Sequence, residues 1–506
     1  MTKFSLKKKL LPSLMAASLA SGVAFSGNAN AIHLAEDGIG QALLAPMYLA
    51  NYGYKTKIAI VNHSTEKAVK AKVVLRSAVT STELLDFILY LSPGDVWRGE
   101  IRQQDLDKDG TTETVLYSAD DSIKNDKVPA GSGVAVNADG TTFGSILPVT
   151  QKIFIQNVGN GDTEKMGHIE IIGLYAVDGD INVPASNAVP ISQGMSKFAL
   201  AKIFDTPRVT GLEPINTPTE TTSPTTSKIR SADPSWIHLS GTIEMMSAND
   251  RMGYRIPALV GADGDNIPSP LPAGLPTSTA PFDGKVIANT AFDANAAAGV
   301  AETALGFGWG VLGTDKIIEV EMALASTMLT GTYEDDTHTT PTAGINRTRI
   351  MITFPTRYRH GEGSDVNGTI VPNNPCGVTG LVGADHFSSP FKTGGSIEYA
   401  LSAYNNFEIG SAVSGSIFSG GPVDGLNQLV EVNYFIPSWP ATKKQNDNLT
   451  LVVGTHNFES GWFKMLFDVR EGCPYAGAPV LSFIHKHKEK ALAQFTESWL
   501  VSASHN

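Results

Sequence analysis

The chain is poor in cysteine, in aromatic residues and in positive charge. Its 506 residues include 2 Cys, 8% aromatic residues, and 38 Lys and Arg against 50 Asp and Glu, which gives a net charge of −12. A nucleic-acid or anionic-lipid partner needs clustered Lys and Arg, so this balance argues against both. Beyond residue 31, no segment reaches the ~20 uninterrupted apolar residues of a spanning helix, and we expect no transmembrane segment.

The sequence also lacks the short motifs of common enzyme classes, since it contains no GxSxG, no HExxH and no P-loop. Gly308–Gly313 spells GxGxxG, but no strand pattern precedes it and no helix pattern follows, so a dinucleotide site is not expected. We therefore expect no enzymatic activity. A carboxylate-based hydrolase stays open as an alternative, because carboxylates such as Glu170, Glu244 and Glu431 could meet only in the folded chain.

The N-terminus has the pattern of a secretory signal peptide. Lysines at positions 3, 7, 8 and 9 precede a short apolar run from Leu10 to Phe25, and Ala29-Asn30-Ala31 supplies small residues for cleavage. We predict that residues 1–31 are removed and that the mature chain lies beyond the inner membrane. We expect an extracellular or outer-surface location rather than the periplasm.

The two cysteines, Cys376 and Cys473, are predicted to form one disulfide, because an exported protein folds under oxidising conditions. In the chain-entropy model, a bridge that closes a loop of about 100 residues stabilises the fold by ~4–5 kcal/mol. Two separate buried thiols are the alternative.

Alternation of apolar and polar residues dominates the sequence and predicts an all-β, antiparallel fold with little helix. The three clearest strands are expected at Thr56–Asn62, Val69–Leu75 and Leu84–Leu91, the last one ended by the turn Ser92-Pro93-Gly94-Asp95. Further strands are expected at Lys152–Val158, His168–Val177, Trp236–Met246, Ile317–Ala323, Arg347–Phe354, Ile397–Ala403, Leu429–Phe435, Leu449–Val453, Trp462–Val469 and Val480–Ile484. Short helices are expected at Ala291–Leu305 and Lys486–Phe495.

The length predicts more than one domain. We expect an N-terminal β-sandwich domain at 32–213, a Thr/Pro-rich linker at 214–235, and a C-terminal β-rich domain at 236–506 with a long loop near 263–300. Both loose stretches have too few apolar residues to contribute to a core. The alternative is that both are loops within one larger β assembly.

Asp105, Asp107 and Asp109, followed by Gly110 and Glu113, form the sharpest local motif. Carboxylates at alternate positions can converge on one cation, the glycine permits a tight turn, and calcium prefers such hard oxygen ligands. Leu116 stands where a full EF-hand loop has its bidentate Glu. We therefore predict a calcium-stabilised loop with these four acidic residues as ligands, and an acidic surface turn is the alternative.

Two weaker patterns involve histidine and tryptophan. His485-Lys486-His487 places two imidazoles on alternate residues, but the lysine repels cations, so an exposed basic tail is expected. Tryptophans 97, 236, 309, 439 and 462 could line a carbohydrate-stacking face. They lie in or beside expected strands, however, where core packing is the favoured interpretation.

Several segments together resemble a family of secreted, β-rich cell-surface proteins of Gram-negative bacteria that has no assigned reaction. They are Ala45–Tyr48, Tyr54–Asn62, Leu85–Trp97, Ile352–Arg357, Val430–Asn433, Gly461-Trp462 and Pro479–Phe483. The resemblance implies secretion and a β fold, and it implies no functional residue.

The expected role is that of a structural or interaction protein at the cell surface, such as a lattice, filament or matrix subunit or an adhesin. Its expected partners are further copies of itself, other surface proteins or polysaccharide. A polysaccharide-binding module is the first alternative, and the hydrolase is the second.

Overall fold

A computed structural model describes residues 32–51, 53–78, 83–105, 108–120, 134–136, 142–145, 154–159, 164–177, 191–197, 199–200, 236–248, 250–260, 320–334, 345–355, 363–364, 370–371, 397–405, 410–417, 432–435, 460–468, 477–489, 496–502 and 504–505. The predicted signal peptide, the predicted linker, the predicted long loop and the GxGxxG segment lie outside these residues. The same holds for the expected helix at Ala291–Leu305 and the expected strand at Leu449–Val453.

The described chain is mostly β-strand with almost no helix, which confirms the predicted fold class. The described strand pairs are antiparallel, except for the parallel pair of β8 and β10. Within these residues, helical conformation is limited to short turns such as 320–324. No helix in this part of the chain is long and apolar enough to cross a membrane.

Two large sheets come from the N-terminal half. Sheet A has the order β1-β14-β2-β11-β4-β5, and sheet B has the order β13-β12-β3-β6-β7-β10-β8-β9. The strands of sheet A are β1 (His33–Leu34), β14 (Ala258–Val260), β2 (Ala42–Leu49), β11 (Met166–Val177), β4 (Ala68–Ser77) and β5 (Glu83–Leu91). Those of sheet B are β13 (Arg251–Arg255), β12 (Leu239–Met246), β3 (Lys55–Asn62), β6 (Val96–Gln104), β7 (Glu113–Ser118), β10 (Phe154–Gly159), β8 (Val134–Val136) and β9 (Thr142–Ser145).

Sheets A and B pack face to face around a common core. Sheet A contributes residues such as Val73 and Phe87, and sheet B contributes Ile58, Trp97 and Ile243. The rings of Phe87 and Trp97 contact each other across this core, with 5.5 Å between their centroids. Because side chains alternate between the two faces of a strand, the neighbours of these residues in sequence point away from this core.

Two further sheets come from the C-terminal half. Sheet C has the order β21-β20-β23-β16-β27, and sheet D has the order β22-β17-β25-β26. The strands of sheet C are β21 (Gly410–Ile417), β20 (Ile397–Asn405), β23 (Ser460–Asp468), β16 (Met328–Glu334) and β27 (Ser504–His505). Those of sheet D are β22 (Val432–Phe435), β17 (Ile345–Thr353), β25 (Leu481–Glu489) and β26 (Thr496–Ser502). Two short pairs complete the list, β15 (Ala325–Ser326) with β24 (Ala478–Pro479) and β18 (Gly363–Ser364) with β19 (Ile370–Val371).

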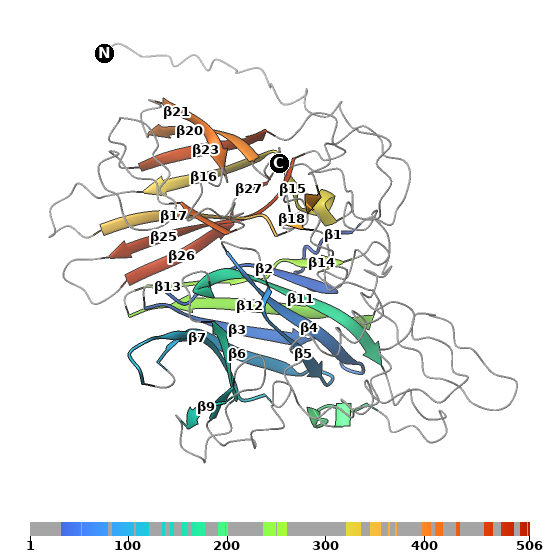
Figure 1. The fold of residues 1–506 in the computed structure, drawn as a ribbon. Helices are drawn as coiled ribbons and strands as arrows, with labels where there is room; N and C mark the ends of the chain where they lie inside the picture. The colour runs from blue at the N-terminus through green and yellow to red at the C-terminus, as the bar shows by residue number, and fades with distance from the viewer. Residues whose placement is uncertain are drawn as a thin grey trace, which may run out of the picture.

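Sheet D lies between sheet C and the N-terminal sheets, as Figure 1 shows. One face of β25 points toward sheet C, where a Cβ added at Gly331 would lie 2.0 Å from Cδ1 of Ile484. The other face of β25 points toward sheets A and B. There Phe483 stacks on Tyr254 with 4.7 Å between ring centroids, and Met351 and Phe483 join the N-terminal core cluster.

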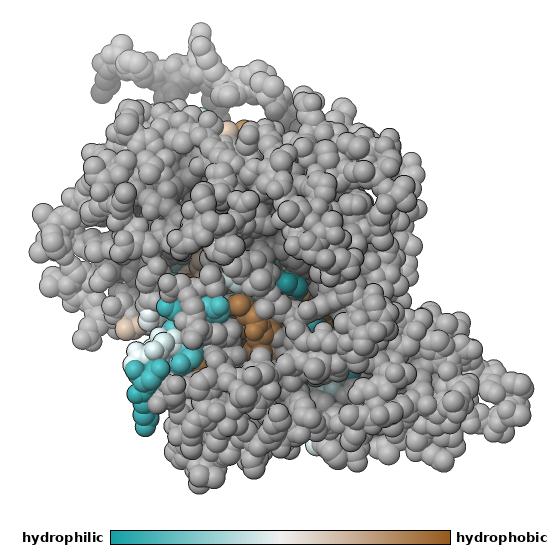
Figure 2. Space-filling model, in the orientation of Figure 1, coloured by the Kyte–Doolittle hydropathy of each residue, from teal (hydrophilic) through white to brown (hydrophobic). Residues whose placement is uncertain are grey.

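Polar contacts reinforce the junction between sheet D and the N-terminal sheets. The Thr353 hydroxyl donates a hydrogen bond to the Pro46 carbonyl at 2.6 Å. Nε2 of His485 lies 3.3 Å from the Asp250 carboxylate, whose other oxygen accepts a hydrogen bond from the Tyr54 hydroxyl. On the face shown in Figure 2, most of the described residues that can be seen lie in separate patches at and below the height of this junction, and they include both hydrophilic and hydrophobic residues.

The strands on both sides of the predicted linker share sheets. Strand β12 pairs with β3, and β14 pairs with β2, although the sequence assigned residues from 236 onward to the second domain. Hydrogen bonding therefore joins residues 239–260 to the N-terminal sheets.

Three local predictions in the C-terminal half are wrong. Lys486 lies in strand β25, paired on both sides with β17 and β26, where a helix was expected. His485 is fully buried and Lys486 nearly so, which rules out an exposed basic tail at these residues. The strand expected at Ile317–Ala323 includes residues 320–323, which are helical. At Lys486, strand pairing with β17 and β26 outweighs the local composition.

Candidate functional site

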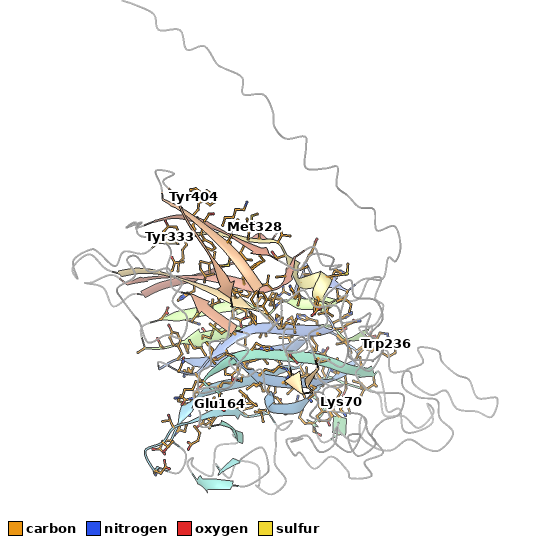
Figure 3. The ribbon with its side chains drawn as sticks, turned by 45° about the horizontal axis from the view of Figure 1, so that its top comes forward. Lys70, Glu164, Trp236, Met328, Tyr333 and Tyr404 are labelled. Carbon is orange, nitrogen blue, oxygen red and sulfur yellow. The ribbon has the colours of Figure 1, made fainter. Side chains whose placement is uncertain are left out.

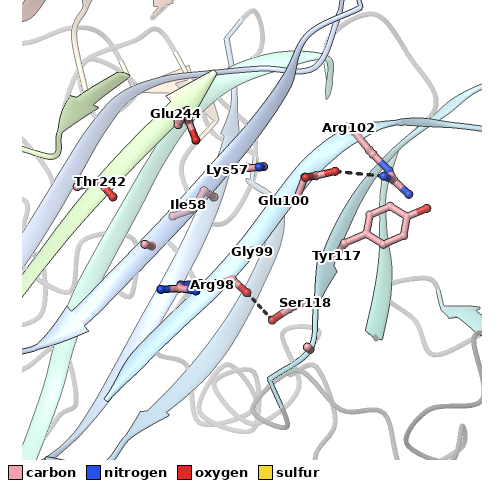
Figure 4. A pocket seen from close by; sticks show the side chains of 12 residues that line it. Lys57, Ile58, Arg98, Gly99, Glu100, Arg102, Tyr117, Ser118, Thr242 and Glu244 are labelled. Atoms are coloured by element: carbon pink, nitrogen blue, oxygen red, sulfur yellow. Dashed lines mark hydrogen bonds and ion pairs between the residues drawn. The ribbon is translucent and has the colours of Figure 1, made fainter. Parts of the chain in front are cut away.

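The outward face of sheet B carries the candidate site, a groove with a volume of about 740 Å³. In strand β3 the alternating pattern buries Ile58 and Ile60 in the core and turns Lys57 and Ala59 outward. The neighbouring strands β12, β6 and β7 follow the same rule. Their register therefore decides which outward side chains meet across the sheet (Figure 4).

Two adjacent rows of side chains cross this part of sheet B. The first row spans strands β12, β3, β6 and β7, and the second spans β12, β3 and β6. In the first row, Glu244 stands opposite Lys57, Lys57 opposite Glu100, and Glu100 opposite Tyr117. In the second row, Thr242 stands opposite Ala59, and Ala59 opposite Arg98. Because Thr242 and Ala59 are small, the sheet is hollowed beside the charged row, with Arg98 on the far side of Ala59.

Ion pairs neutralise both carboxylates of the groove. Glu100 is paired with Arg102 at 3.1 Å and with Lys55 at 3.4 Å, and Glu244 is paired with Arg251. The guanidinium of Arg102 also lies 3.9 Å from the ring centroid of Tyr117, which is 8% exposed. Tyr117 therefore holds Arg102 in place and offers little ring surface to a ligand.

Arg98 and Lys57 are the exposed cations of the groove. Within the described part of the chain, neither side chain takes part in an ion pair or a hydrogen bond. The backbone carbonyl of Arg98 accepts a hydrogen bond from the Ser118 hydroxyl at 2.7 Å, which ties β6 to β7 at this point. The strand position of Arg98 is thus fixed, while its guanidinium is available to a ligand.

The acidic loop between β6 and β7 contains three of the four predicted calcium ligands among its described residues. The Asp105 carboxylate accepts a hydrogen bond from the Gly110 amide at 3.1 Å, and Asp109 accepts one from the Thr111 amide at 2.7 Å. Lys108 and Gly110 have φ angles of 64° and 91°, so the loop turns sharply at both. Glu113 is buried at the start of β7.

Asp107 lies outside the described residues, so the predicted ligand set stays untested. Among the residues that are described, no group of three or more His, Cys, Asp and Glu side chains could hold a metal ion. Oδ1 of Asp105 is nevertheless buried, and no described residue gives it a hydrogen bond. Cys376 and Cys473 also lie outside the described residues, and the disulfide remains a prediction.

Of the carboxylates considered for a hydrolase, the two that the structure describes, Glu170 and Glu244, are not brought together. Glu170 is fully buried on the face of sheet A that points away from the common core, and its carboxylate lies 2.8 Å from Nε of Arg76. Glu244 lies on the outward face of sheet B, so the two carboxylates are on opposite sides of the pair of sheets. Glu431 is outside the described residues.

The tryptophans divide between core and surface. Trp97 is fully buried in the common core, whereas Trp462 on sheet C is 43% exposed. Trp462 stacks on Tyr404 with 4.3 Å between ring centroids, so one of its faces is already covered. Figure 3 places Tyr404 at the opposite end of the molecule from Glu164 and Lys70. Trp309 and Trp439 lie outside the described residues.

Sequence reasoning missed the groove, although Glu244 was considered for another reason. The alternation in β3 was recognised, and it predicts that Lys57 and Ala59 share a face. Nothing in the sequence, however, gives the register that places Thr242 and Arg98 beside Ala59. Comparison with protein-family models, with curated proteins and with solved structures found no match for this chain.

Proposed function

We propose that the protein is exported and acts at the cell surface as a structural or interaction protein. The observation that carries this proposal is the groove on sheet B, in which two exposed cations stand on a rigid sheet face. Its volume of about 740 Å³ falls within the ~300–1,000 Å³ that ligand pockets usually have. The signal-peptide pattern and the resemblance to secreted surface proteins add the expected location.

The proposed architecture keeps the two sandwich-like units expected from the sequence, but it places residues 239–260 in the first unit. Sheets A and B would form the first unit, and sheets C and D the second. The stacking of Phe483 on Tyr254 and the hydrogen bond from Thr353 to Pro46 would then hold the units together. Such a fixed arrangement suits a subunit of a larger assembly that bears mechanical load. Further copies of the same chain are therefore proposed partners.

Calcium is the proposed stabilising ion, bound by Asp105, Asp107, Asp109 and Glu113. A buried carboxylate oxygen without a hydrogen-bond donor is costly, and Oδ1 of Asp105 is in that position. A cation in the loop would satisfy it. By analogy with extracellular modules, the expected dissociation constant is on the order of 10⁻⁴–10⁻³ M.

Cell fractionation followed by sizing of the surface fraction tests this proposal. We expect the protein in the surface or extracellular fraction, in large assemblies that loosen when a calcium chelator is added. An Asp105→Asn/Asp109→Asn variant is expected to resemble the chelated protein even with calcium present, because it lacks two of the proposed ligands. Lys108→Gln, which changes an exposed residue of the same loop, is the matched control.

The possible outcomes separate the parts of the proposal. Recovery of the protein only as a soluble periplasmic monomer would contradict the surface role. Large surface assemblies that are unchanged by the chelator and by the double substitution would support the surface role. They would contradict the proposal that calcium stabilises the assembly.

A further inference from the structure

The groove on sheet B has a local charge opposite to that of the whole chain. The chain carries a net charge of −12, yet the two groove side chains without an ion pair in the described structure, Lys57 and Arg98, are both cationic. The carboxylates of Glu100 and Glu244 are neutralised by their own arginine and lysine partners. An anionic group would therefore be attracted to this groove and repelled by most of the remaining surface.

The positions of the two cations limit how the negative charges of a ligand can be spaced. Lys57 stands directly opposite Glu100, and Arg98 lies two residues before Glu100 on the same strand. The two cations are diagonal neighbours, which are about 7–8 Å apart in an antiparallel pair, with their Cβ atoms somewhat closer. A polyanion with closely spaced charges would also meet Glu100 and Glu244. A chain whose charges are separated by neutral units avoids this repulsion.

The hydrogen-bonding groups of the groove suit carboxylates and hydroxyls. The planar guanidinium of Arg98 can bind a carboxylate through two parallel hydrogen bonds, whereas the Lys57 ammonium acts as a point charge. The hydroxyl of Thr242 lines the same groove and can exchange hydrogen bonds with neutral hydroxyl groups. A sugar chain that bears spaced carboxylates combines both features, and a nucleic acid, with its dense phosphates, does not.

We propose that the groove binds an acidic, carboxylate-bearing polysaccharide that runs across strands β12, β3 and β6, with Arg98 and Lys57 pairing with carboxylates of the sugar chain. This inference rests on the proposed surface role and names the ligand class of the same site. Thr242 and Ala59 leave the space for the sugar rings, because larger outward residues in that row would fill it.

Calorimetric titration of the full mature chain with a hyaluronan oligosaccharide, in which each carboxylate-bearing sugar alternates with a neutral one, tests the inference, and a neutral oligosaccharide of equal length serves as the comparison. We expect binding of the acidic oligomer alone, weakened by added salt because the cations are exposed. Arg98→Gln should weaken binding about tenfold or more, since hydrogen bonds between charged groups are among the strong ones. Lys57→Gln should weaken it less.

Two further variants keep the result interpretable. Thr242→Phe should abolish binding by filling the hollow without changing any charge. Lys108→Gln removes one exposed positive charge outside the groove and should bind like the unchanged protein. Circular dichroism of each variant shows whether the fold is retained. If Arg98→Gln does not fold, Arg98→Lys replaces it, because lysine keeps the positive charge but lacks the planar guanidinium.

Three results would overturn the inference. They are equal affinity for the neutral oligomer, equal or tighter affinity for an acidic peptide such as polyglutamate, and binding of the acidic oligomer that survives both Arg98→Gln and Thr242→Phe. If fractionation finds the protein at the surface and titration shows no acidic-glycan binding, the ligand class is wrong and the surface role stands. Groove-dependent binding by a protein found only inside the cell contradicts the surface role instead.

Discussion

Glu170→Gln is expected to destabilise the protein by about 3–5 kcal/mol, the usual cost of breaking a buried ion pair from one side. The Glu170 carboxylate is fully buried on sheet A, 2.8 Å from Nε of Arg76 and 3.4 Å from Nε2 of His168. The substitution leaves the buried Arg76 guanidinium without this counter-charge. Urea unfolding at neutral pH measures the loss of free energy.

The same residue gives a pH-dependent test. Burial raises the pKa of the Glu170 carboxyl, but the charges and hydrogen bonds of Arg76 and His168 outweigh burial and hold the pKa below its usual value. A group whose pKa is lowered by folding stabilises the protein at neutral pH. It loses that stabilisation as the pH falls below about 4.3 and through the folded pKa. The difference between the unchanged protein and Glu170→Gln should therefore shrink in acid.

A double substitution is the control for the ion pair. Replacing both partners with apolar residues, as in Arg76→Met/Glu170→Leu, removes the pair without leaving a buried charge. It should recover a substantial part of the stability lost in Glu170→Gln. A single variant that unfolds within ~1 kcal/mol of the unchanged protein would show that the pair lies nearer to water than the structure places it.

Trp97→Ala is expected to cost about 3–5 kcal/mol, as for other large-to-small changes in cores. Trp97 is fully buried between sheets A and B and contacts Phe87 with 5.5 Å between ring centroids. Removing the indole leaves a cavity where the two sheets meet. The midpoint of urea unfolding, with the slope checked for constancy, gives the effect.

Gly99 provides the matched test of how Trp97 packs. A Cβ added at Gly99 would lie 2.4 Å from Cη2 of Trp97, so Gly99→Ala should destabilise the protein. Trp97→Phe removes the clashing atoms and also removes the buried Nε1–H, which has no hydrogen-bond partner among the described residues. Gly99→Ala should therefore cost less in the Trp97→Phe background than alone. Equal costs in both backgrounds would show that the indole does not lie over Gly99.

The strands with clear alternation could be predicted from the sequence, and those without it could not. Thr56–Asn62 was predicted and β3 occupies Lys55–Asn62, because one face of this strand is buried and the other is more exposed. Strand β2 is buried on both faces, so Ala42–Leu49 shows no alternation and was missed. Strand β6 was missed as well, since Gly99 interrupts the apolar series between Trp97 and Ile101.

The candidate site depends on information that a single sequence does not contain. Alternation identifies the outward residues of one strand, but the groove needs the register of four strands at once. Glu170 shows the same limit, because its partner Arg76 is 94 residues away in sequence. A helix was expected from Lys486 onward, whereas β17 and β26 pair with β25 on both sides at this residue.

The most direct test of the proposed surface role labels one groove residue on intact cells. Lys57→Cys places a thiol on the exposed face of sheet B, and Ala71→Cys places one in the buried core. With a membrane-impermeant maleimide, we predict rapid labelling of the Lys57→Cys variant on intact cells and labelling of the Ala71→Cys variant only after unfolding. Labelling of the Lys57→Cys variant only after the outer membrane is permeabilised would contradict a role at the cell surface.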